Sequence, residues 1–140
     1  MGYRIVRLSE VGVSSSKRSL KGDRDVENSW VAAELPDNPG KVLDFGCSTS
    51  HLPLLEGMKG GDVIGLDLLP VEVPFNSTNV RYQQGDILDL DFGDTRFDVI
   101  VSCSSIEHVG LAGRYGSQDV EQGDLAAMQC LRDLLTTPFW

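Results

Sequence analysis

The chain has 140 residues, of which 41% are hydrophobic and 24% are charged, as in an ordinary globular domain. This composition excludes collagen-like repeats and wholesale disorder. The formal net charge of −9 is unevenly distributed, because residues 1–24 carry +4 and the remaining 116 residues carry −13. Since phosphate binding needs a positive face, we expect no nucleic-acid partner for the main body.

The sequence offers no segment for membrane insertion or export. No run approaches the roughly 18 apolar residues of a membrane span, and the first 20 residues lack the apolar core of a signal peptide. We therefore expect a cytoplasmic protein with no membrane partner. The cysteines at 47, 103 and 130 form no C-x-x-C pair, so we expect neither a disulfide framework nor a bound metal.

Helical and strand-like patterns alternate along the chain. Residues 1–22 are basic and precede any regular pattern, and we interpret them as a flexible arm before a domain at 23–140. Helical spacing of apolar residues covers 23–35, 51–59 and 123–135, and short β-branched or aliphatic runs cover 42–45, 63–67, 80–83 and 97–102. Strands that alternate with helices predict an α/β domain with a parallel sheet.

Open parallel sheets bind ligands at the carboxyl ends of their strands. Asp67 ends the second strand-like run, 21 positions after Gly46. An acid at that spacing suits a ribose diol, because one carboxylate accepts from both hydroxyls. Ser48 and His51 occupy the second and third glycine positions of a dinucleotide-binding loop, and no Walker lysine follows. The pattern therefore indicates a nucleoside cofactor without phosphates.

Four motifs resemble, in order and spacing, those of class I S-adenosylmethionine-dependent methyltransferases. They are VLDFGC at 42–47, VIGLD at 63–67, NVRYQQGDI at 79–87 and FDVIVS with IEHV at 97–109. The resemblance covers roughly residues 40 to 135. It implies a Rossmann-like, doubly wound, mainly parallel sheet that lacks the terminal strands of the full fold, and S-adenosylmethionine as cofactor.

The resemblance also implies a role for each residue near the strand ends. The methionine part of the cofactor would be lined by Asp44, Gly46, Cys47 and Ser48, and the ribose hydroxyls would be bound by Asp67. The adenine amino group would be bound by Asp86, and the two faces of the ring would contact Leu68 and Ile87. Ser102 would complete the site. An acidic pocket suits a cofactor that bears a sulfonium and an ammonium group. Because serines stand where the family commonly has further glycines, we expect the loop to reach positive φ less readily.

Few side chains are needed for methyl transfer, because alignment supplies much of the rate. We expect His108 to act as general base toward an oxygen or nitrogen acceptor, with Glu107 orienting it or binding the acceptor. A structural role for His108 is the alternative. His51 is expected to cap or pack against the second helix, and the Cys47 thiol lies beside a helix start, where a thiol pKa can fall.

The predicted function is methyl transfer from S-adenosylmethionine to a small-molecule or glycan-related acceptor. One alternative is a truncated, non-catalytic domain that binds S-adenosylmethionine or S-adenosylhomocysteine and acts through a partner; another is a nicotinamide-dependent oxidoreductase, which the missing glycines disfavour. Residues 134–139 fit either a short fifth strand or a tail. Because the sheet would end here, we expect homo-oligomerisation through the open edge, or coverage of that edge by C-terminal residues.

Overall fold

The computed structural model describes residues 23–48, 50–71, 77–113 and 119–137, so the basic arm expected at 1–22 lies outside the described residues. The elements, in chain order, are α1 (Asp23–Glu34), β1 (Lys41–Phe45), α2 (Leu52–Met58), β2 (Asp62–Asp67), β3 (Val80–Gln84), β4 (Val99–Ser102), the single 3-10 turn η2 (Ile106–His108) and α3 (Gly123–Asp133). No helix within these ranges is long and apolar enough to cross a bilayer.

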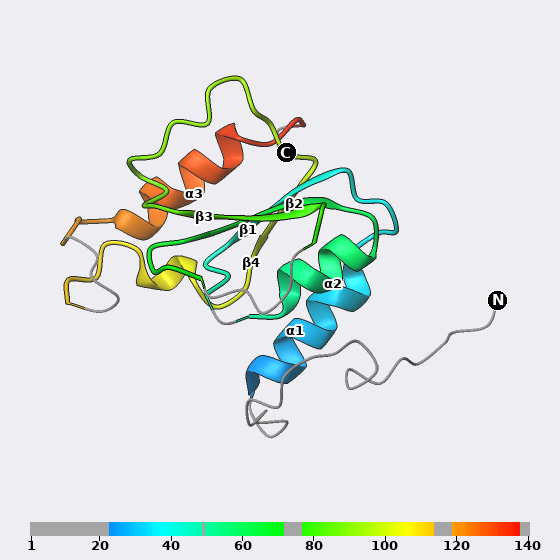
Figure 1. Cartoon of the computed structure of the whole chain (residues 1–140). Coiled ribbons are helices and arrows are strands. Elements are labelled where there is room, and N and C mark those ends of the chain that lie inside the picture. The colour runs from blue at the N-terminus through cyan, green and yellow to red at the C-terminus, as the bar shows by residue number, and fades with distance from the viewer. Residues whose placement is uncertain (1–22, 49, 72–76, 114–118, 138–140) are drawn as a thin grey trace.

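The four strands form one parallel sheet in the order β3-β2-β1-β4. The chain first builds outward from β1 to β3 and then returns to add β4 on the opposite side of β1. Figure 1 shows α3 on one face of the sheet and α1 with α2 on the other. The predicted Rossmann-like, doubly wound sheet is confirmed, and its strand order reverses beside β1, where such folds bind ligands.

Alternate residues of β1 serve the two faces of the sheet, as the pleat of a strand requires. Leu43 and Phe45 belong to the core on the α3 side, which includes Leu131. Val42 belongs to the core on the other side, together with Leu52 of α2. Because Val42, Leu43 and Phe45 place buried apolar side chains on both faces, burial of β1 fixes both helical layers to the sheet.

The fourth strand is shorter than its sequence pattern predicts, because it begins at Val99 and not at Phe97. Asp98 keeps one hydrogen bond to β1, from its N–H to the carbonyl of Lys41 (2.8 Å). Phe97 instead forms a parallel bridge with Leu135. Its N–H donates to the carbonyl of Leu134 (2.8 Å), and its carbonyl accepts from the N–H of Thr136 (2.9 Å). C-terminal residues therefore lie beside the β4 edge, one of the two arrangements expected from the sequence, while the fifth strand is reduced to a single bridge. Self-association stays a prediction.

Among the described residues, Phe97 is the largest fully buried side chain, and it meets Phe92 edge to face with ring centroids 5.7 Å apart. We expect Phe97→Ala to lower the free energy of unfolding by about 3–5 kcal/mol, because the core cannot fill the cavity. Urea denaturation measures this change. Met58→Ala is the control, since that side chain is 67% exposed and should change stability by less than about 0.5 kcal/mol. Equal losses in both variants would contradict this assignment of the core.

Candidate cofactor and active site

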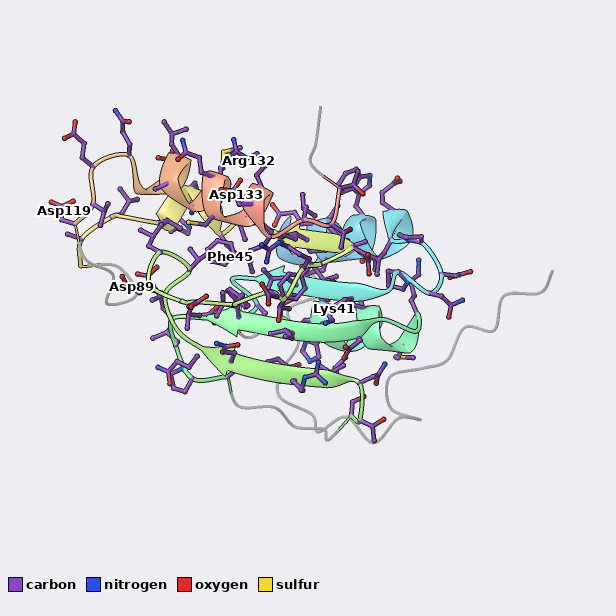
Figure 2. The ribbon with its side chains drawn as sticks, turned by 90° about the horizontal axis from the view of Figure 1, so that it is seen from above. Lys41, Phe45, Asp89, Asp119, Arg132 and Asp133 are labelled. Carbon is purple, nitrogen blue, oxygen red and sulfur yellow. The ribbon has the colours of Figure 1, made fainter. Side chains whose placement is uncertain are left out.

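The predicted site residues gather at the carboxyl end of the sheet. In Figure 2, Lys41 and Phe45 mark the two ends of β1, and Asp89 and Asp119 lie beyond the Phe45 end. The parallel register aligns Phe45 with Leu66 of β2 and with Ser102 of β4. The ends of these three strands therefore meet at one edge. Ser102 itself is exposed there.

The loop after β1 turns sharply against the end of β2. Gly46 has φ +79°, and its N–H and that of Cys47 both donate to the carbonyl of Leu66, at 2.8 and 3.3 Å. Ser48 also has a positive φ, of +29°. Ser48 thus reaches a positive φ although serine adopts it less readily than glycine. Its N–H donates to Oδ2 of Asp67 (2.7 Å), which supports the strained conformation.

Asp67 is placed between the two loops that follow β1 and β2. Its side chain is 9% exposed; Oδ2 accepts from the N–H of Ser48, and Oδ1 accepts from the N–H of Leu69 (2.9 Å). Gln84 Nε2 donates to the carbonyl of Leu68 (2.9 Å), which fixes the β2 loop to the end of β3. Each carboxylate oxygen keeps a further lone pair, so Asp67 can still accept from hydroxyls of a ligand.

The residues predicted for adenine recognition follow β3. Asp86 is half-buried, and its Oδ1 accepts from the N–H of Leu88 (2.9 Å), which closes the turn. Ile87 is 3% exposed and packs in the α3-side core. Leu68, on the neighbouring loop, is half-buried. Asp86 and Leu68 are thus the more accessible members of this predicted subsite.

The segment after β4 is locked onto the β1 loop. Ser105 Oγ lies within hydrogen-bond distance of two carbonyls to which it can donate, Gly46 at 3.2 Å and Cys103 at 3.0 Å. A Cβ added at Gly46 would lie 2.1 Å from that Oγ. Only glycine therefore allows the two loops to approach this closely.

Residue Glu56, which the sequence analysis did not single out, forms a buried carboxyl pair with Asp44. Asp44 is 2% exposed and Glu56 is fully buried; among the described residues, Asp44 Oδ2 and both Glu56 oxygens have no hydrogen-bond partner. Burial, with repulsion from Asp67, raises the pKa of Asp44 to about 7. Burial, with repulsion from Asp44, raises the pKa of Glu56 to about 9. The sequence signal that could have indicated burial of Glu56 is its position four residues after Leu52, which places both side chains on the same face of the helix.

The acids also change the chemistry of Cys47. Burial first, and then repulsion from Asp44 and Asp67, raises the pKa of the thiol well above its usual range. The lowering of the thiol pKa that a helix start can cause does not occur at Cys47, so the thiol is neutral and buried. Burial likewise raises the pKa of Tyr82 to about 12. A Cβ at Gly65 would meet Cys47 Sγ at 2.9 Å and the Tyr82 ring at 3.0 Å, so glycine permits this packing.

The start of α2 is capped by serine and not by histidine. His51 occupies the cap position, but its side chain makes no cap hydrogen bond. Ser50 Oγ instead accepts from the N–H of Leu52 (3.0 Å). Of the two roles expected for His51, capping is therefore wrong. Packing stays a prediction, and the His51 ring is half-buried.

The candidate acceptor side is built from η2 and α1. His108 and Glu107 lie on η2, with side chains 23% and 52% exposed and Nε2 3.9 Å from Oε1. Ser104 has φ +51°, and its Oγ donates to Oε2 of Glu27 on α1 (2.9 Å). Glu27 was not predicted, because nothing local in the sequence indicates that α1 reaches the end of β4.

The buried pair predicts a stability that falls as the pH rises. Glu56 has a pKa of about 9 in the folded chain and an ordinary value of 4.5, so the folded state binds more protons across that interval. We expect the free energy of unfolding to decline between these pH values. Glu56→Gln should flatten the profile and, at pH 9, be more stable than the parent by about 1–3 kcal/mol.

Chemical denaturation at a series of pH values measures both profiles. Glu34→Gln is the control, because Glu34 is an exposed acid on α1. The control should keep the slope of the parent. If Glu56→Gln also kept that slope, the buried carboxyl would not be the source of the pH dependence.

Known proteins resemble this chain over the region that contains the candidate site. A sequence model of a family described as a methyltransferase domain matches residues 43–130. The ribosomal RNA large subunit methyltransferase E of Brachyspira hyodysenteriae is 36% identical over 91 residues, which cover 61% of this chain and 45% of that protein. The ubiquinone biosynthesis O-methyltransferase of Cereibacter sphaeroides is 30% identical over 94 residues, with coverages of 62% and 36%. The chain thus spans less than half the length of these relatives.

Solved structures share the architecture. An amino pentose methyltransferase from Micromonospora echinaspora, solved with S-adenosylmethionine bound, aligns with a TM-score of 0.56 and 19% identity. The alignment covers 100% of this chain and 59% of that one. At this identity the likeness concerns the fold, and it agrees with the parallel sheet described above.

Proposed function

The chain belongs to the methyltransferase domain family, and we propose that it binds S-adenosylmethionine and transfers the methyl group to a small-molecule or glycan-related acceptor. The observation that carries the proposal is the link between Asp67 and the β1 loop, at the point where the strand order reverses. It holds a carboxylate beside a glycine turn, where the ribose of a nucleoside cofactor would be recognised.

The described residues fit this cofactor. Asp44 Oδ2 is buried and has no partner among them, and Asp67 lies close enough to raise its pKa. A negative environment favours a ligand that carries an ammonium and a sulfonium group over one that carries phosphates. The positive φ at Gly46 and Ser48 turns backbone amides toward Leu66 and Asp67, which keeps the loop close to both acids.

S-adenosylmethionine supplies the activated methyl group, and the residues of this chain bind, orient and move a proton. The methionine part of the cofactor would be held by Asp44, Gly46, Cys47 and Ser48, and the ribose hydroxyls by Asp67. The adenine would be held by Asp86, Leu68 and Ile87. Ser102, at the end of β4, would complete the cofactor site. His108 would accept the proton of the acceptor at a ring nitrogen, and Glu107 would orient that ring or bind the acceptor. The proximity of the β4 segment to Gly46 supports this division.

The relatives support more than one class of acceptor. The match to a ubiquinone biosynthesis O-methyltransferase and the fold shared with an amino pentose methyltransferase favour small molecules or sugars. The match to a ribosomal RNA methyltransferase favours RNA. The charge of −13 on residues 25–140 argues for the first class, because RNA phosphates would be repelled.

The proposal is tested by calorimetric titration with S-adenosylhomocysteine, followed by turnover with methyl-labelled S-adenosylmethionine. The acceptor panel contains amino sugars, neutral sugars, phenols and ribosomal RNA. We expect binding, and transfer to a small acceptor. Transfer to RNA alone would show that the acceptor is RNA and not a small molecule. Binding without any transfer would indicate a cofactor-binding domain that acts through a partner. Absence of binding would overturn the proposal.

We expect Asp67→Ala to weaken S-adenosylhomocysteine binding by about 1–3 kcal/mol, because the ribose hydroxyls and the Ser48 amide lose a charged acceptor. Calorimetry measures the affinity. Asp62→Asn is the matched control, since Asp62 lies at the opposite end of β2 and pairs with Arg81 (2.8 Å). Asp86→Asn should have a smaller effect than Asp67→Ala. Unchanged affinity in Asp67→Ala would refute the ribose assignment.

His108→Ala should lower turnover on a hydroxyl acceptor by about 10²-fold if the imidazole is the general base. The affinity for S-adenosylhomocysteine should stay within twofold of the parent, or roughly 0.4 kcal/mol. Initial rates at saturating acceptor, with a denaturation curve for each variant, separate catalysis from folding. A folded variant with full turnover would leave His108 a structural residue.

A further inference from the structure

Three carboxyl oxygens that have no hydrogen-bond partner among the described residues lie between α2 and the sheet. They are Oδ2 of Asp44 and both oxygens of Glu56, each in a side chain at least nine-tenths buried. Asp44 is flanked in the sheet by Gly65 on β2 and by Val101 on β4, which bring no polar side chain. The described part of the chain therefore supplies no donor for these oxygens.

None of the described basic side chains on the neighbouring elements donates to the three carboxyl oxygens. Among the described side chains on the elements around the pair, the acidic and other neutral-or-negative groups are Asp62 and Asp67 (β2), Cys47 (β1 loop), Tyr82 (β3), and Glu27 and Glu34 (α1). The basic groups are Lys41 at the start of β1, Arg81 on β3, which pairs with Asp62 (2.8 Å), and His51 and Lys59 at the two ends of α2. Asp67 repels the Asp44 charge, and Asp44 repels that of Glu56. Lys59 donates its Nζ to the carbonyl of Leu35, beyond the C-terminal end of α2. Within the described ranges, the two carboxyls therefore have no cationic hydrogen-bond partner.

Two adjacent buried carboxyls without donors cannot both be ionised, because each charge would lack solvation and would repel the other. The directions of the pKa shifts at both residues agree with this reasoning. Such a pair holds protons until a cation comes close. Asp44 lies two residues before Gly46, at the loop proposed to hold the methionine part of the cofactor.

We propose that Asp44 and Glu56 form a proton-loaded counterion site, which releases a proton to solvent when the ammonium-bearing end of the cofactor binds at the β1 loop. The inference rests on the proposed function. One carboxyl O–H bond breaks, the proton passes to the buffer, and the resulting carboxylate balances the ammonium charge of the ligand. Cofactor affinity then rises with pH, since fewer protons remain to be displaced.

Calorimetric titration with S-adenosylhomocysteine at pH 7, in phosphate and in Tris, tests this inference on the full chain. The two buffers differ in ionisation enthalpy, so the difference in observed heat counts the protons released. We expect about half to one proton per ligand bound. Infrared difference spectra of the same samples should show loss of a protonated-carboxyl band on binding.

Glu56→Gln should release less than half as many protons as the parent and lack that infrared band. The control Asp62→Asn should match the parent, because Asp62 is an exposed acid paired with Arg81. If the parent bound with equal heats in both buffers, the inference would be overturned while the proposed function stood. If it showed no binding at all, the proposed function would fail first. Full proton release by a folded Glu56→Gln variant would overturn the proposed pair, because Glu56 would then have no part in the release.

Discussion

The burial of β1 between β2 and β4 is the constraint on which the rest of the structure depends. Four of its five residues are buried, and its two neighbours align Leu66 and Ser102 beside its last residue. This register places the β1 loop against the carbonyl of Leu66 and the carboxylate of Asp67. The apolar pattern that holds the core together thus also decides where the cofactor loop turns.

Close packing at this edge relies on residues without bulk. Gly46 admits the Ser105 hydroxyl, and Gly65 admits Cys47 and Tyr82, at distances that a Cβ would not allow. The result is a tightly sealed layer around Asp44, in which a charge has little access to water. Poor access to water is the physical reason why acids that suit a cationic ligand are expected to cost stability in the unliganded chain when they ionise.

The candidate site combines local conflicts that the fold tolerates. Ser48 and Ser104 hold positive φ without being glycine, and each is supported by a hydrogen bond to an acid, Asp67 or Glu27. Buried Glu56 has no donor among the described residues. Such departures from local preference are common at ligand-binding sites, because the shape and charge that bind a ligand often lower the stability of the unliganded protein.

The sequence by itself determined the parallel α/β sheet, the helix from Asp23, and the spacing that puts Asp67 across from the Gly46 turn, because these follow from periodicity and turn residues within short windows. Only the tertiary structure decided that Glu56 joins Asp44, that the Cys47 pKa rises, and that Leu135 pairs with Phe97. Burial and electrostatic repulsion depend on what packs across from a residue. Those partners are distant in the chain, so a local pattern carries no record of them.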